Sequence, residues 1–258
     1  MNYAASVALS SGKDFASVPM FQGVESDVLR ELMASAHTAH YQKGTLFLAQ
    51  GESVSRSYVM MEGWCGASKV NTEGQEALLQ LFHRGDFLLE AGSSVFADIS
   101  PMNLQALTPV RLFTLAPGAV RLAMDRSMVL TTNMLASSVR LCQELRDHIE
   151  QLALHTAEQR VGHFLLQMRF NTCPEGDTIV LPFDKALIAA YLNIKPETLS
   201  RVLQSFRKRG FMIERSHLTL PFRQALCEYC DKILMQSCPF AQTADCSIVT
   251  TNGAATKK

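Results

Sequence analysis

The sequence lacks the features that mark membrane and secreted proteins. It has no run of about 18 apolar residues, the length that a helix needs to cross a bilayer. No basic stretch precedes the first apolar residues, which argues against a signal peptide. We therefore expect a cytoplasmic protein without a membrane partner, in which the seven cysteines are thiols or ligands rather than disulfides.

Patterns that carry enzyme chemistry are also missing. There is no glycine-rich phosphate loop, no nucleophile elbow and no paired-carboxylate arrangement, so we expect no enzyme activity. Net charge is zero but unevenly spread, because residues 1–155 carry 11 basic and 15 acidic side chains and residues 156–222 carry 9 and 6. One basic segment in a neutral chain is typical of DNA binding confined to one domain.

Glycine is frequent in the first part of the chain and absent from its middle. Short apolar runs are broken at the spacing of turns between strands by Gly44, Gly51, Gly63, Gly74 and Gly85. Between residues 122 and 154 there is neither glycine nor proline, as in a long helix. This pattern predicts a flexible arm over residues 1–17, an antiparallel β-roll with a small helical cap over 18–121, and a dimerisation helix over 122–155.

Residues along the predicted helix repeat every seven positions. Leu141, Leu145 and Leu152 form the clearest seam, which Met134 and His148 extend. Such spacing is typical of two helices packed against each other in a coiled coil. We expect a homodimer through this helix, and the alternative is that the seam packs within one subunit.

Residues 184–220 have the pattern of a helix-turn-helix followed by a β-hairpin wing. Asp184 is a candidate N-cap for a short helix, and residues 193–195 have the length of the connecting turn. Pro196 suits the first position of the second helix, where its missing N–H costs nothing. A helix that opens with a capping box at Thr156 precedes this pattern, which predicts a winged helix domain over 156–222.

The second helix of this pattern presents side chains suited to a DNA major groove. Glu197, Ser200 and Arg201 stand at i, i+3 and i+4 and therefore share one face. Arginine can donate to guanine O6 and N7, and glutamate can accept from cytosine N4. Double-stranded DNA is therefore the predicted partner. The predicted DNA-binding residues are Lys195, Glu197, Thr198, Ser200, Arg201, Arg207 and Lys208.

Four cysteines are concentrated in a C-terminal extension over residues 223–258. They are Cys227, Cys230, Cys238 and Cys246. A C-x2-C pair lets two thiolates reach one metal, and two further cysteines complete a four-thiolate shell. The preferred interpretation is an iron–sulfur cluster of the 4Fe-4S type. A structural zinc, a thiol–disulfide switch and an inert tail are the alternatives.

Residues 18–222 resemble the Crp/Fnr family of bacterial transcription regulators. The resemblance is carried by AEQRVGHFLLQMRF (157–170) and by LPFDKALIAAYLNIKPETLSRVLQSFRKRGFM (181–212). Within the family, the Glu-x-x-Ser-Arg motif is similar to that of the fumarate–nitrate reductase and denitrification regulators. The resemblance implies a symmetric dimer in which Glu197, Ser200 and Arg201 read a TTGAT-like inverted repeat, with RNA polymerase as a further partner.

Two departures from the family pattern concern the signal. Cyclic-nucleotide binders of the family carry a Gly-Glu-Leu turn and an Arg-Ser pair, but here Leu89 precedes Glu90, and Ser100-Pro101 stand in place of the pair. Without that arginine we do not expect cyclic AMP to bind in the usual way. The N-terminal cysteine cluster of the oxygen-sensing branch is missing, since the first cysteine is Cys65. Haem sensing in the family makes His83 and His155 weaker candidate ligands.

These observations predict an α+β protein with an N-terminal β-roll sensor, a long dimerisation helix and a C-terminal winged helix-turn-helix. Its predicted function is transcription regulation in response to oxygen, nitric oxide or redox state. The alternative is a small-molecule-binding subunit or an iron–sulfur redox protein that does not bind DNA.

Overall fold

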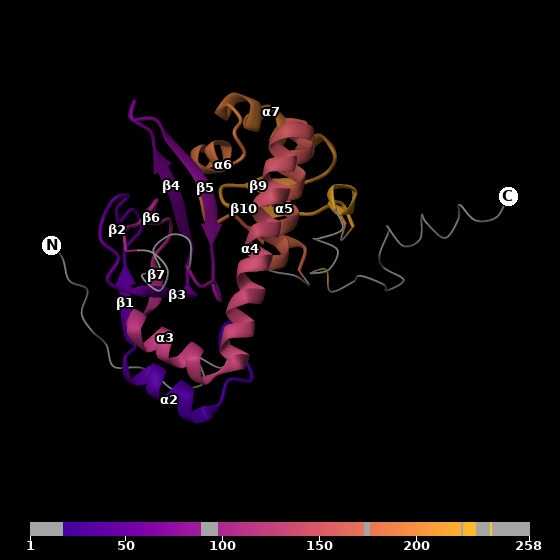
Figure 1. Cartoon of the computed structure of the whole chain (residues 1–258). Helices are drawn as coiled ribbons and strands as arrows, with labels where there is room; N and C mark the ends of the chain where they lie inside the picture. The colour runs from indigo at the N-terminus through magenta and orange to yellow at the C-terminus, as the bar shows by residue number, and fades with distance from the viewer. Residues whose placement is uncertain (1–17, 89–97, 173–175, 223, 231–237, 239–258) are drawn as a thin grey trace. The chain divides into compact units, whose positions relative to one another are not determined.

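The computed structural model describes residues 18–88, 98–172, 176–222, 224–230 and 238 (Figure 1). Residue contacts divide the chain into two compact units, Met1–Asp147 and His148–Lys258. No helix among the described residues is long and apolar enough to cross a membrane.

Two antiparallel sheets form the β-roll of the first unit. One has the order β1-β7-β3 and the other the order β2-β6-β4-β5. The strands are β1 (His37–Tyr41), β2 (Leu46–Leu48), β3 (Ser57–Glu62), β4 (Cys65–Val70), β5 (Glu76–Phe82), β6 (Asn103–Ala106) and β7 (Val110–Leu115). All five glycines predicted at turns have a positive φ. At Gly63 a Cβ would also lie 2.2 Å from the Pro109 carbonyl oxygen, so only glycine fits between β3 and β4.

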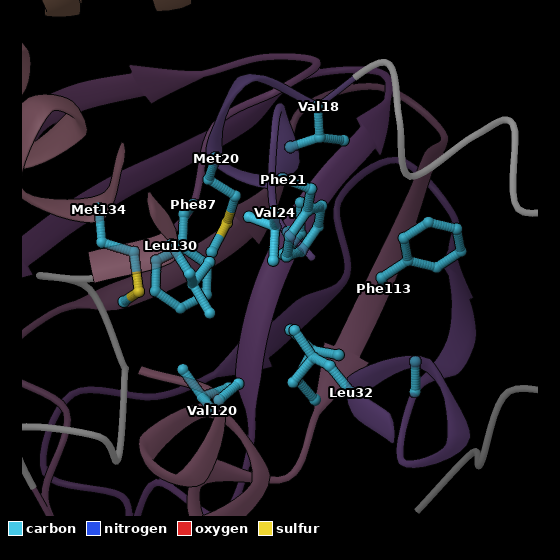
Figure 2. Close-up of a cluster of buried hydrophobic side chains, with 14 of the residues drawn as sticks. Val18, Met20, Phe21, Val24, Leu32, Phe87, Phe113, Val120, Leu130 and Met134 are labelled. Carbon is cyan, nitrogen blue, oxygen red and sulfur yellow. The ribbon is translucent and has the colours of Figure 1, made fainter. Parts of the chain in front are cut away.

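Helices pack against the sheet β1-β7-β3 through an apolar cluster. They are η1 (Pro19–Phe21), α2 (Ser26–Ala34), α3 (Pro117–Arg126) and the first part of α4 (Met128–Leu154). Figure 2 shows side chains of this cluster, among them Phe21, Leu32, Phe113 and Leu130, which come from four different elements. The side-chain amide of Asn133 on α4 also donates to the carbonyl oxygens of Met20 in η1 and of Gln22 directly after it. The small helical cap predicted from the sequence is thus part of the core.

The helix predicted to begin at residue 122 is two helices, separated at Ser127. This residue is extended, with φ −125° and ψ 106°, and is completely buried. Its hydroxyl accepts from the Leu130 amide at 3.1 Å and donates to the Glu25 carboxylate. Ser127 therefore caps the N-terminus of α4, and the long helix starts at Met128 instead of residue 122.

The predicted apolar seam is turned partly towards its own subunit. Met134 and Leu141 are only 3% and 9% exposed, because they pack against the β-roll. Exposed apolar side chains occupy a neighbouring line on α4 instead, with Leu135 at 65%, Val139 at 49% and Ile149 at 65%. For Met134 and Leu141, the alternative of packing within the subunit is therefore the correct one.

The second unit is a winged helix domain. Its helices are α5 (Ala157–Thr172), α6 (Lys185–Tyr191) and α7 (Pro196–Lys208), and a single 3-10 turn, η2 (Cys227–Tyr229), follows the wing. Its sheet has the order β8-β10-β9, with β8 (Thr178–Val180), β9 (Met212–Glu214) and β10 (His217–Thr219). Thr156 and Gln159 form the predicted capping box, in which the Thr156 amide donates to Gln159 Oε1 at 2.9 Å. The predicted α+β fold class is confirmed.

Candidate DNA-binding interface

Helix α7 divides into a buried face and an exposed face, as its sequence predicts. Leu199, Val202, Leu203 and Phe206 are at most 8% exposed and attach the helix to the core of the domain. The opposite face presents Glu197, Ser200 and Arg201 to solvent. Because α7 is fixed by one face only, the other is available to enter a groove.

The N-terminal end of α7 is positioned by the turn that precedes it. Asn193 adopts a left-handed conformation with φ +50°, which an asparagine tolerates better than most residues. Arg160 on α5 donates to the carbonyl oxygens of Leu192 at 2.8 Å and Asn193 at 3.4 Å. An arginine on the neighbouring helix thus fixes the turn of the helix-turn-helix.

The C-terminal end of α7 is positioned by the wing. Gly210, with φ +93°, ends the helix, and the Phe211 amide then donates to the Phe206 carbonyl oxygen at 3.2 Å. Arg207 donates to the carbonyl oxygen of Ile213 on β9 at 3.1 Å. The wing and α7 therefore share a direct hydrogen bond.

The seven predicted DNA-binding residues all lie on or beside α7. Lys195 is its N-cap and is exposed, as are Arg207 and Lys208 in the last turn, whereas Thr198 is half-buried. Sequence reasoning did not include Gln204, which is exposed three residues after Arg201 on the same face. The i+3 spacing was a signal that could have found it.

Arg209, the C-cap of α7, connects three parts of the domain. Its guanidinium donates to the Glu228 carboxylate and the Tyr229 hydroxyl, both at 2.8 Å, and lies 3.1 Å from the Glu158 carboxylate. It also lies 4.3 Å above the centre of the Phe206 ring. The basic run 207–209 predicts the positive charge of Arg209. It does not predict the partners of Arg209, because they are distant in sequence.

Tyr229 packs tightly on helix α5. A Cβ added to Gly162 would lie 2.4 Å from the Tyr229 ring, so the ring fits only because residue 162 has no side chain. Burial raises the pKa of Tyr229 to about 12, despite the opposing effect of Arg209. Its hydroxyl stays protonated at neutral pH and donates to Glu158 at 3.4 Å.

Residues 159–229 match the Crp-like helix-turn-helix domain, and residues 38–127 match the cyclic nucleotide-binding domain. The two matches indicate the same family, since a sensor-type domain of this kind and a Crp-like helix-turn-helix are both present in one chain. The chain belongs to the Crp/Fnr family of transcription regulators.

Relatives of this Crp/Fnr chain are similar over most of their length. The nitrogen fixation regulation protein FixK of Bradyrhizobium diazoefficiens is 27% identical over 188 residues, which are 70% of this chain and 76% of FixK. A CRP-like cAMP-activated global transcriptional regulator of Mycobacterium tuberculosis is 26% identical over 199 residues, 75% of this chain and 87% of that protein. The structure of FixK2 from Bradyrhizobium japonicum shares the fold, with a TM-score of 0.68 and 21% identity over 76% of this chain and 98% of FixK2. The chain is thus a DNA-binding transcription regulator.

The first unit of this Crp/Fnr regulator has a neutral, internally bonded residue at position 100. Ser100 is 1% exposed, and its hydroxyl donates to the Met102 carbonyl oxygen at 2.6 Å. Its amide donates to the Glu52 carbonyl oxygen at 2.9 Å. Leu89 and Glu90, the other positions of the predicted departure, lie outside the described residues.

The two histidines considered as haem ligands lie in different surroundings. His83 Nδ1 is 3.0 Å from the Arg84 carbonyl oxygen and 3.6 Å from Asp86 Oδ2. Burial raises the pKa of Asp86, and the neighbouring His83 lowers it in part. His155 follows α4 in the second unit, where its amide donates to the Gln151 carbonyl oxygen. Haem binding at either residue stays a prediction.

Of the four predicted metal ligands, the structure describes three. Cys227 begins η2, Cys230 follows it directly, and Cys238 is half-buried, whereas Cys246 lies outside the described residues. In the described part of the chain, no three His, Cys, Asp or Glu side chains form a group that could hold a metal ion. The four-thiolate site therefore stays a prediction.

Proposed function

We propose that this Crp/Fnr regulator is a cytoplasmic homodimer that reads a TTGAT-like inverted repeat. The observation that carries the proposal is the exposed face of α7, on which Glu197, Ser200 and Arg201 lie side by side. Arginine pairs with guanine O6 and N7, and glutamate accepts from cytosine N4, so this face suits the G·C pair of such a half-site. RNA polymerase is the further partner that an activator or repressor at a promoter would meet.

Binding to a labelled inverted repeat, measured by fluorescence anisotropy at fixed salt, tests the proposal. We predict that Arg201→Ala weakens specific binding by about 1–3 kcal/mol and relaxes the preference for guanine. The matched comparison is binding to the same duplex in which the G·C pair of each half-site is replaced by an A·T pair. Glu73→Gln, in an exposed turn of the first unit, serves as the control and should bind like the wild type.

An Arg201→Ala protein that binds the repeat as tightly as the wild type would contradict this assignment. Wild-type protein that does not bind the repeat specifically would instead favour the second candidate function, a small-molecule-binding subunit or iron–sulfur redox protein that does not bind DNA.

The dimer is proposed to form along α4. Leu135, Val139 and Ile149 are apolar and exposed on one line of this helix, and Cys142 lies midway between Leu135 and Ile149. The spacing of seven residues from 135 to 142 and to 149 is that of a two-stranded seam. A second copy of α4 would cover these side chains.

The signal is proposed to be oxygen, nitric oxide or redox state, received by the C-terminal cysteines rather than by a cyclic nucleotide. Cys227, Cys230, Cys238 and Cys246 are the proposed ligands of a 4Fe-4S cluster. Zinc at these cysteines and haem at His83 or His155 are the alternatives. Iron and sulfide analysis of protein purified without oxygen, together with its visible spectrum, separates these groups. A ligand that binds the folded state raises the melting temperature. Because we do not expect cyclic AMP to bind, it should leave both the melting temperature and the DNA affinity unchanged.

A further inference from the structure

Two residues lie between Cys227 and Cys230, and both are hydrogen-bonded to Arg209 at the C-terminal end of α7. The Cys230 amide donates to the Cys227 carbonyl oxygen at 3.1 Å, which closes a single tight turn. Glu228 and Tyr229 lie inside this turn, and both accept a hydrogen bond from Arg209. The cysteine pair and the C-cap of α7 are therefore joined through one turn of backbone.

The contact of Arg209 with Glu228 and Tyr229 is fixed by the packing of Tyr229 against its neighbours. The Tyr229 ring rests on Gly162 of α5, and its hydroxyl donates to Glu158. On the side of α7, the ring centres of Phe206 and Tyr229 are 5.9 Å apart. Leu226, directly before the turn, is completely buried. We call Glu158, Arg209, Glu228 and Tyr229 the latch.

The turn also brings the two cysteines within reach of a disulfide. Residues at the two ends of such a turn have Cα atoms less than about 7 Å apart. A disulfide spans Cα separations of about 4.4–6.8 Å. Both side chains are partly exposed, so a small oxidant can reach them. The bond would enclose Glu228 and Tyr229 in a small ring and impose new backbone angles on both.

We propose that Cys227 and Cys230 form a redox switch that controls DNA affinity through the latch. The proposal rests on the DNA binding proposed above and requires no metal at the cysteines. The oxidant is a small-molecule disulfide such as oxidised glutathione. One cysteine thiolate attacks it and releases a glutathione thiolate, and the other cysteine then attacks the mixed disulfide and releases the second. Two electrons pass to glutathione, whose thiolates take up the two protons that the cysteines lose.

The full chain, purified in air and reduced, is compared with the same protein after treatment with oxidised glutathione. Mass spectrometry of the peptide containing both cysteines reports the disulfide by the loss of two hydrogen atoms. We expect oxidised wild-type protein to bind the inverted repeat roughly tenfold more weakly, the scale of one lost hydrogen bond to a charged group. Cys227→Ser and Cys230→Ser should each abolish the response, and treating the oxidised wild-type protein with a thiol reductant should restore its affinity.

A double variant, Glu228→Gln with Tyr229→Phe, tests whether the latch transmits the change. It keeps the size of both side chains and the ring on Gly162, so the fold should persist, which circular dichroism checks. Reduced, it should already bind like the oxidised wild type. It should form the disulfide, and its affinity should then change by less than about twofold.

A double variant that loses affinity on oxidation as the wild type does would overturn the role of the latch. Failure of the wild type to form the disulfide, or unchanged affinity once it has formed, would overturn the switch itself. Reduced wild-type protein that does not bind the repeat at all would contradict the proposed function, and the switch with it.

Discussion

His148 lies where the end of α4 meets the helix-turn-helix. Its ring stacks on Tyr191 of α6 at a centroid distance of 4.5 Å. Burial lowers the pKa of His148, and the neighbouring His163 and Arg160 on α5 lower it further. A neutral imidazole is therefore built into the contact between three helices.

We predict that acidification destabilises this contact. Because the folded state lowers the pKa of His148, its contribution to stability is complete above the unfolded pKa of about 6.5 and is lost as the pH falls below it. His148→Phe keeps a ring on Tyr191 but does not titrate, so its unfolding free energy should fall less between about pH 7.5 and pH 5.5. Urea unfolding at both pH values measures the unfolding free energy of each protein. An equal fall in unfolding free energy for the wild type and for His148→Phe would contradict the prediction.

Helix α6 depends on bonds from outside itself. With seven residues it is too short to be stable alone, since isolated helices shorter than about 12–15 residues are marginal in water. Asp184 accepts from the Leu187 amide at 2.9 Å at its start, and Arg160 donates to the Leu192 carbonyl oxygen at its end. These two bonds hold the first helix of the helix-turn-helix, against which α7 packs.

Asp184→Ala should therefore lower the unfolding free energy by about 1 kcal/mol, the usual cost of removing an N-cap. Asp184→Asn is the matched control, because asparagine caps equally well, and it should stay within a few tenths of a kcal/mol of the wild type. Thermal unfolding followed by circular dichroism compares the three proteins. A similar loss in both variants would indicate that the charge of Asp184, rather than its cap, is what matters.

The elements that the sequence predicts well are those whose signals are local. Thr156 with Gln159, Asp184 with Leu187, and the proline at the start of α7 all act within one helical turn, and each was confirmed. The break at Ser127 was missed although its cap to the Leu130 amide is equally local, because no glycine or proline marks it. The second bond of its hydroxyl is to Glu25, about a hundred positions earlier. Long-range partners of this kind leave no periodic pattern.

The same reason explains what was missed at the candidate site. The residues on the exposed face of α7 follow from helical spacing alone, so all of them except Gln204 were predicted individually. The partners of Arg209 lie on α5 and in the C-terminal extension, and only the folded domain brings Glu158 and Tyr229 to it. Likewise, a seven-residue repeat does not tell which of two neighbouring apolar lines on α4 faces the β-roll, as Met134 and Leu135 show.

For the whole molecule, the exposed line on α4 determines the oligomeric state that we propose. Leu135→Glu places a charge on this line and should convert the dimer to a monomer with weakened binding to the inverted repeat, since both half-sites must be held at once. Leu122→Glu, at an exposed apolar position of α3, is the control and should remain dimeric. Sedimentation equilibrium measures the mass, and a dimer that survives Leu135→Glu would place the interface elsewhere.

The close approach of Tyr229 to Gly162 has a consequence for how related sequences can vary. A Cβ at position 162 would overlap the aromatic ring, so neither residue can change freely while the other stays. Descendants of this chain that acquire alanine or a larger residue at 162 should also have lost the aromatic ring at 229. The two positions should therefore covary among its orthologues, although 66 residues separate them in the chain.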